Sequence, residues 1–146
     1  MYLKGLMAYS DRRIKITYDL TVDGKLIHSF NMNKPFRYVQ GKKDILPGLQ
    51  KAIKGLKPGQ RKAIQLSPKQ GYGIRNPQSV MEMSKTRFPK RDHFIGKEIR
   101  SQRDGKFLAT VREVRKETLV LDFNHPLAGK TLHYDVRVLS IKDPSF

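Results

Sequence analysis

Apolar and polar side chains alternate along residues 13–20, and this alternation restricts the segment to an extended conformation. The apolar members are Ile14, Ile16, Tyr18 and Leu20. A period of two predicts a β-strand with one buried face, because in a helix these side chains would point in all directions. Asp23-Gly24 follows and favours a tight hairpin turn, so we expect residues 25–29 to return beside the first strand.

Further strands and a single helix are expected along the chain. The other predicted strands are 36–39, 61–66, 98–103, 106–111, 112–114, 118–123 and 131–141. The helical pattern begins at Pro47-Gly48, and Gly55 is placed to end it. Its apolar positions are Leu49, Ala52, Ile53 and Leu56. Many antiparallel strands with one short helix predict an α+β fold, a curled antiparallel sheet with the helix on its concave face.

Three aromatic residues of the predicted strands would meet under this helix. Tyr18, Phe36 and Tyr134 would line a hollow there, and a concave, mostly apolar site with a few polar groups is a common form of binding site. Aromatic side chains that alternate along strands are also ordinary core residues. The pattern alone therefore leaves two interpretations open, a pocket and a plain core.

The charge of the chain is strongly unbalanced. Its 146 residues include 30 Lys and Arg against 13 Asp and Glu, a net charge of +17. Residues 1–76 hold 16 of the basic and 4 of the acidic side chains. Such a field attracts polyanions and acidic chains. A basic surface that only keeps the protein in solution is the alternative.

Composition excludes several kinds of chemistry. The absence of cysteine rules out disulfides, thiolate metal sites and cysteine nucleophiles. The histidines His28, His93, His125 and His133 show no ligand pair at helical spacing, so we expect no metal and no cofactor. No apolar run approaches the roughly 18 residues of a membrane span, and the first residues do not resemble a secretory signal. We therefore expect a cytoplasmic protein that does not enter membranes.

A series of Gly- and Pro-containing motifs follows the first strands. They are Asn33-Lys34-Pro35-Phe36-Arg37-Tyr38, Gly41, Ile45-Leu46-Pro47-Gly48-Leu49, Gly55-Leu56-Lys57-Pro58-Gly59, Leu66-Ser67-Pro68 and Tyr72-Gly73. Together they resemble the FK506-binding-protein (FKBP) family of peptidyl-prolyl cis-trans isomerases. The motif at residues 122–134 is similar to the prokaryotic SlyD/SlpA branch, in which a small insert-in-flap domain binds unfolded chains. The resemblance implies a discontinuous isomerase domain, 1–76 and 120–146, and an insert-in-flap chaperone domain, 77–119.

The resemblance also implies the residues of a prolyl pocket. The implied catalytic residues are Tyr18, His28, Phe36, Tyr72 and Tyr134. The implied substrate-binding residues are Ile27, Ile45, Leu46, Leu49, His125 and Leu127. His28 stands where the family usually has Asp, and a neutral imidazole supplies no fixed negative charge. We therefore expect a lower isomerase activity than in a typical family member.

The inserted segment carries soft apolar side chains that suit promiscuous contact. They are Met81, Met83, Phe88, Phe94 and Ile95. These residues are expected to form a chaperone surface for unfolded or nascent polypeptides. The same residues would also serve as the small core of the insert, and the sequence leaves this alternative open.

A different function is also consistent with the sequence. A non-catalytic or weakly active module of the same fold would dock on a ribosome, a nucleic acid or an acidic protein complex. The basic candidates are Arg12, Arg13, Lys42, Lys43, Lys51, Lys54, Lys57, Arg61 and Lys62. No sequence motif of a nucleic-acid-binding fold accompanies them, so the predicted association is salt-dependent and weakly specific.

Overall fold

The computed structural model describes residues 11–42 and 45–143, which form two compact units. The main unit contains Met1–Gly73 and Lys130–Phe146, and the inserted unit contains Ile74–Gly129. The inserted unit is therefore wider than the segment 77–119 expected from the sequence. The strand that ends at Asp122 explains part of the difference, because it pairs only with strands of the inserted unit.

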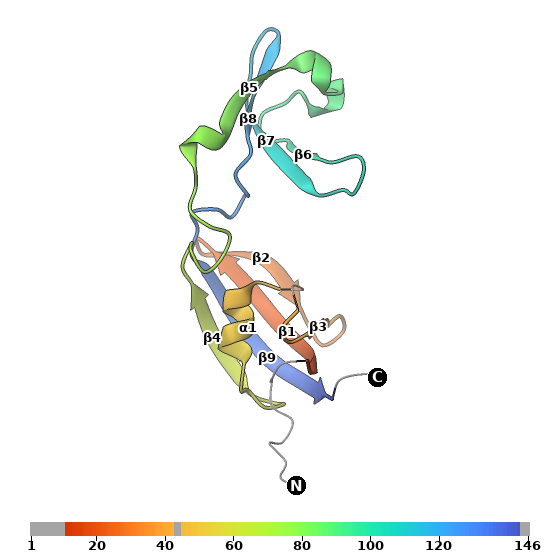
Figure 1. The fold of residues 1–146 in the computed structure, drawn as a ribbon, viewed down its shortest axis with the longest axis vertical. Helices are drawn as coiled ribbons and strands as arrows, with labels where there is room; N and C mark the ends of the chain where they lie inside the picture. The colour runs from red at the N-terminus through yellow and green to blue at the C-terminus, as the bar shows by residue number, and fades with distance from the viewer. Residues whose placement is uncertain (1–10, 43–44, 144–146) are drawn as a thin grey trace. The chain divides into compact units, whose positions relative to one another are not determined.

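The main unit is built on an antiparallel sheet (Figure 1). Its strands are β1 (Arg13–Val22), β2 (Lys25–Phe30), β3 (Phe36–Val39), β4 (Arg61–Leu66) and β9 (Leu132–Lys142). The C-terminal strand β9 lies between β1 and β4. β3 pairs with the first half of β1 and β2 with the second half, so these two strands follow one another along the same edge of β1.

The hairpin predicted at Asp23-Gly24 is confirmed. Both residues have positive φ, 51° and 77°, as a tight turn between twisted strands requires. The pairing of β2 with β1 shifts between Leu20 and Thr21, which leaves Ile27 as an extra residue on β2. A second shift lies where β9 passes Lys15 and Ile16 of β1.

The helix α1 (Pro47–Ile53) lies across one face of the sheet (Figure 1). Leu49 and Ile53 are buried, as the apolar spacing predicts. The helix ends before Leu56, the last position of the predicted pattern, because Lys54 leaves the helical path with a ψ of 130° and Gly55 continues the turn with a positive φ of 86°. Within residues 11–42 and 45–143, no helix has the length and hydropathy of a transmembrane span.

The inserted unit has a sheet and a core of its own. Its strands, in sheet order, are β5 (Val80–Ser84), β8 (Thr118–Asp122), β7 (Phe107–Val114) and β6 (Glu98–Arg100). Short 3₁₀ turns occupy Pro77–Ser79, Lys85–Arg87 and Lys90–Asp92. The predicted strands 106–111 and 112–114 form the single strand β7. The core consists of Ile99, Ala109, Val111, Leu119 and Leu121.

In the described residues of both units together, antiparallel strands and one short α-helix confirm the predicted α+β fold class.

Candidate functional site

Aromatic rings gather on the face of the sheet that bears α1. The ring of Tyr18 on β1 lies 5.4 Å from that of Tyr134 on β9 and 6.1 Å from that of Phe36 on β3. The ring of Phe30 on β2 lies 5.2 Å from Tyr18 and 5.0 Å from Phe36. Such tilted and edge-on contacts are the favoured geometries of aromatic pairs. The cluster joins four strands, so the sheet itself fixes the positions of the rings.

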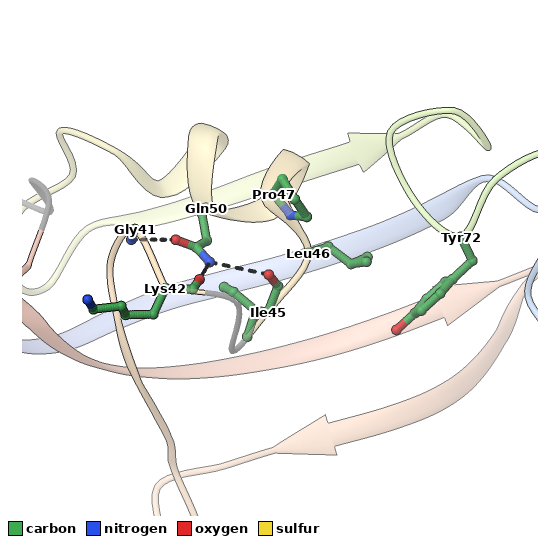
Figure 2. Close-up of a pocket in the computed structure, with 7 residues that line it drawn as sticks. All are labelled: Gly41, Lys42, Ile45, Leu46, Pro47, Gln50 and Tyr72. Atoms are coloured by element: carbon green, nitrogen blue, oxygen red, sulfur yellow. Dashed lines mark hydrogen bonds between the residues drawn. The ribbon is translucent and has the colours of Figure 1, made fainter. Parts of the chain in front are cut away.

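Beside α1 the main unit has an open cavity of about 620 Å³. Ile45, Leu46 and Pro47 contribute apolar side chains to its wall, and Tyr72 contributes a half-exposed phenol ring from the loop after β4 (Figure 2). A cavity of this size with a mostly apolar wall and few polar groups suits a small organic group such as a proline ring.

Gln50 of α1 holds the segment that precedes the helix. Its Oε1 accepts a hydrogen bond of 2.7 Å from the backbone N–H of Gly41. Its Nε2 donates to the carbonyl oxygen of Lys42 and, over 3.2 Å, to that of Ile45 (Figure 2). Because Gln50 is buried, these bonds satisfy groups that water does not reach easily. The side chain therefore fixes Ile45 in the cavity wall.

The tyrosine hydroxyls of the site stay protonated well above neutral pH. Burial raises the pKa of Tyr18 to about 12, and the neighbouring Tyr72 adds to this effect. Burial also raises the pKa of Tyr134, with further contributions from Tyr72 and Tyr18. The pKa of Tyr72 is raised by its own burial. With their pKa values raised, the three phenols keep their protons and can donate hydrogen bonds.

His28 adds a nitrogen to the aromatic cluster. Its Nδ1 lies at hydrogen-bond distance, 3.3 Å, from the hydroxyl of Tyr18, and its ring lies 4.6 Å from that of Phe30. The site thus combines aromatic rings, an apolar cavity wall, protonated phenols and one imidazole. This inventory can bind and orient an apolar ring and a carbonyl group, but it holds no activated nucleophile.

Comparison with known proteins decides the family. The family model described as "FKBP-type peptidyl-prolyl cis-trans isomerase" matches residues 6–139. The chain belongs to the FKBP-type peptidyl-prolyl isomerase family. This result confirms the resemblance seen in the sequence motifs.

Several curated FKBP-type proteins are similar over most of the chain. The SlyD isomerase of Treponema pallidum (strain Nichols) is 33% identical over 133 residues, which cover 89% of this chain and 76% of the relative. The short-type isomerase of Methanocaldococcus jannaschii is 29% identical over 88% of this chain and 90% of the relative. The FKBP-type 16 kDa isomerase of Escherichia coli (strain K12) is 32% identical over 79% of this chain and 78% of the relative.

The predicted pocket residues of this FKBP-type chain do not all lie together. Tyr18, His28, Phe36, Tyr72 and Tyr134 gather in the main unit, as do Ile45 and Leu46 in the cavity wall. Leu49 is only 2% exposed and packs in the core under α1. Ile27 is the extra residue of the shifted β1–β2 pairing and is half-exposed. His125 and Leu127 belong to the inserted unit, so their role at the pocket stays a prediction.

Phe30 and Gln50 were not among the residues predicted from the sequence. Phe30 stands directly opposite Tyr18 in the hairpin, and counting back from Asp23-Gly24 would have paired them only if the bulge at Ile27 were known. Gln50 is a polar residue at a buried position of the helix. Such a residue needs hydrogen-bond partners, and this was the signal in the sequence for its structural role.

The predicted chaperone residues divide between surface and core. Met81, Phe94 and Ile95 are exposed by 53%, 53% and 68%. Met83 and Phe88 pack against the core of the inserted unit. Met83 and Phe88 thus serve the core, whereas a chaperone role of the three exposed residues stays a prediction. In the described part of the chain, no group of three or more His, Asp or Glu side chains lies close enough to hold a metal ion.

Proposed function

We propose that this protein isomerises peptidyl-prolyl bonds in unfolded or nascent polypeptides, and that the inserted unit binds these chains. The aromatic cluster with Tyr72 at the cavity carries the first part of the proposal. The exposed apolar side chains of the inserted unit support the second part. Relatives whose names state this isomerase activity also support the first part.

The reaction needs no bond making or breaking. Rotation about the imide bond faces a barrier of about 18–20 kcal/mol because the bond has partial double-bond character. A catalyst must stabilise the twisted imide more than the planar one. The twisted form is less dipolar, so an apolar surface such as the partly exposed rings of Phe36 and Tyr18 favours it over the planar form. Tyr134 is buried and packs against Tyr18, so it supports this surface. Each ~1.4 kcal/mol of this preference gives a tenfold rate increase.

The protonated phenols fix the substrate while the imide turns. Tyr72 stands half-exposed at the cavity wall, where its hydroxyl can donate to a substrate carbonyl. The hydroxyl of Tyr18 lies at hydrogen-bond distance from His28, and this contact helps to hold the ring of Tyr18 in place. None of these groups exchanges a proton with the substrate, which agrees with their raised pKa values.

Client binding is assigned to the apolar surface of the inserted unit. Met81, Phe94 and Ile95 are exposed, although the unit has a closed core of five buried residues. Exposed Met and aromatic side chains adapt to varied apolar partners. A bound chain has a high local concentration near the isomerase site, since both units belong to one polypeptide.

Two substrates test the proposal. We expect Ile95→Ser to lower kcat/KM on an unfolded protein whose refolding is limited by prolyl isomerisation, and to leave kcat/KM on a prolyl tetrapeptide unchanged. Met32→Ser is the matched control, since Met32 of the main unit is also 68% exposed. Equal effects of Ile95→Ser on both substrates would contradict client binding by the inserted unit. If the wild-type protein does not accelerate isomerisation of the tetrapeptide, the proposed isomerase activity is contradicted.

A further inference from the structure

The sheet of the main unit has a second face, opposite α1, and one end of it is strongly basic. Ile14 and Ile16 of β1 are buried on the helix side. Side chains alternate along a strand, so Arg13 and Lys15 lie on the other face. The register of the neighbouring strands decides which residues accompany them there.

Like charges stand directly opposite one another at this end. Lys15 pairs with Arg37 of β3, and Arg13 pairs with Lys142 of β9. Directly opposed like charges destabilise a sheet. Within residues 11–42 and 45–143, no ion pair involves Lys15, Arg37 or Lys142. We call Arg13, Lys15, Arg37 and Lys142 the basic end.

The other end of the same face is electrically balanced. Arg61 of β4 forms an ion pair of 2.5 Å with Asp135 of β9. Asp19 of β1 accepts a hydrogen bond from the hydroxyl of Ser29. Arg61 also stands opposite Arg137, and Asp19 opposite Asp135, so two basic and two acidic side chains offset one another at this end. The basic end, whose cavity has no acidic side chain in its lining, has no such balance. An external anion would supply the missing partner.

The four basic residues line one open cavity of about 380 Å³, together with Ser140 and no Asp or Glu side chain. Arg13 donates through Nε to the backbone oxygen of Asp143, which leaves the rest of its guanidinium available. The carboxylate of Asp143 lies 3.6 Å from Arg12, outside this set. Guanidinium and ammonium groups placed together in this way suit phosphate oxygens.

We propose that the basic end binds the phosphate backbone of a nucleic acid. A phosphate backbone presents closely spaced negative charges that several neighbouring cations can neutralise together. An acidic peptide is a less suitable occupant, because the lining residues Ile14 and Tyr38 are only 1% and 3% exposed, which leaves Val39 as the one partly exposed apolar anchor in this lining. The net charge of +17 steers polyanions toward the protein.

Fluorescence anisotropy with a short labelled DNA duplex tests this site on the full chain. The variant is Lys15→Gln/Arg37→Gln/Lys142→Gln. The control is Lys51→Gln/Lys54→Gln/Lys57→Gln, which removes the same charge at α1 and just after it. We expect the first variant to weaken binding about tenfold or more and to reduce the slope of log K against log salt by about 2 to 3. The control should change both quantities much less.

Three results would overturn the proposal. Equal losses in the two variants would mean that net charge alone attracts the duplex. Absence of binding by the wild-type protein between about 50 and 200 mM salt would exclude the site. Tighter binding of labelled polyglutamate than of duplex, lost in the same variant, would assign the basic end to acidic proteins. The tetrapeptide isomerase assay, unchanged in both variants, shows that the pocket is intact and separates this proposal from the proposed function.

Discussion

The hydroxyl of Tyr18 and Nδ1 of His28 lie 3.3 Å apart, and this contact joins the aromatic cluster to the edge strand β2. The register explains why the two side chains meet. Tyr18 stands opposite Phe30, and His28 stands opposite Leu20, two residues further along β1. Both pairs place their side chains on the face that bears α1. His28 therefore lies beside the aromatic cluster and affects how Tyr18 is held.

We predict that His28→Asp raises kcat/KM on a prolyl tetrapeptide by about threefold or more. A carboxylate is a stronger acceptor for the hydroxyl of Tyr18 than an imidazole, and it supplies a fixed negative charge beside the aromatic cluster. His28→Asn is the matched control, because it has the shape of Asp without the charge. Equal activities in the wild-type protein and both variants would show that residue 28 does not limit catalysis.

We predict that Tyr72→Phe lowers kcat/KM on the tetrapeptide by about 3- to 10-fold, the effect of losing one hydrogen bond of about 0.5–1.5 kcal/mol. The ring stays, so the cavity wall keeps its shape. Urea unfolding is the control and should show little change, since Tyr72 is 36% exposed. An unchanged kcat/KM would mean that the hydroxyl of Tyr72 does not touch the substrate.

Gln50→Ala should destabilise the protein by about 1–3 kcal/mol, because the backbone groups that Gln50 now satisfies lose their partner. Without Gln50, Ile45 is no longer held in the cavity wall, so we expect KM for the tetrapeptide to rise as well. Urea unfolding and steady-state kinetics measure the two effects. The exposed Gln65→Ala is the control on β4. A stable variant with an unchanged KM would contradict the role given to Gln50.

Alkaline pH should weaken the fold through the buried tyrosines. The pKa of Tyr18 in the folded protein is about 12, and that of Tyr134 is also raised. In the unfolded chain the pKa of a tyrosine is about 10. The folded protein thus keeps protons that the unfolded chain releases. The stabilisation is fully present below about pH 10 and is lost as the pH rises toward about 12.

Urea unfolding across this range checks the sign. The free energy of unfolding of the wild-type protein should fall above about pH 10, and that of Tyr18→Phe/Tyr134→Phe should fall less steeply. Lysine titration affects both proteins equally. Parallel curves for the two proteins would show that these hydroxyls are not the groups that titrate.

The strand pattern of the main unit was predictable because each strand has one buried face. Alternation at Ile14, Ile16 and Leu20 located β1, and Asp23-Gly24 located the hairpin. The bulge at Ile27 was not predictable, since it depends on the register of β2 against β1 and not on local residue preference. The resemblance to the family implies a pocket role for Ile27, whose side chain is half-exposed on the edge strand β2, and that role stays a prediction.

The boundaries of the inserted unit, and the set of residues that form the basic end, both depend on the pairing of strands that are far apart in the sequence. β8 belongs to the inserted unit because it pairs with β5 and β7, which no local signal near Asp122 shows. Likewise, Arg13, Arg37 and Lys142 are far apart in sequence, and the register of β3 and β9 brings them to one place. Of the four residues of the basic end, only Arg13, beside Arg12, was among the basic candidates predicted from the sequence; other candidates, such as Lys51, Lys54 and Lys57, are close together in the sequence.

The rate of prolyl isomerisation in a pocket with one ring removed tests the central claim most directly. Phe36 contacts Tyr18 and Phe30 at ring distances of 6.1 and 5.0 Å, and its removal opens the apolar wall to water. We predict that Phe36→Ala lowers kcat/KM on the prolyl tetrapeptide by about tenfold or more under conditions where circular dichroism shows the variant to be folded. A folded Phe36→Ala protein that isomerises the tetrapeptide as fast as the wild type would contradict the account.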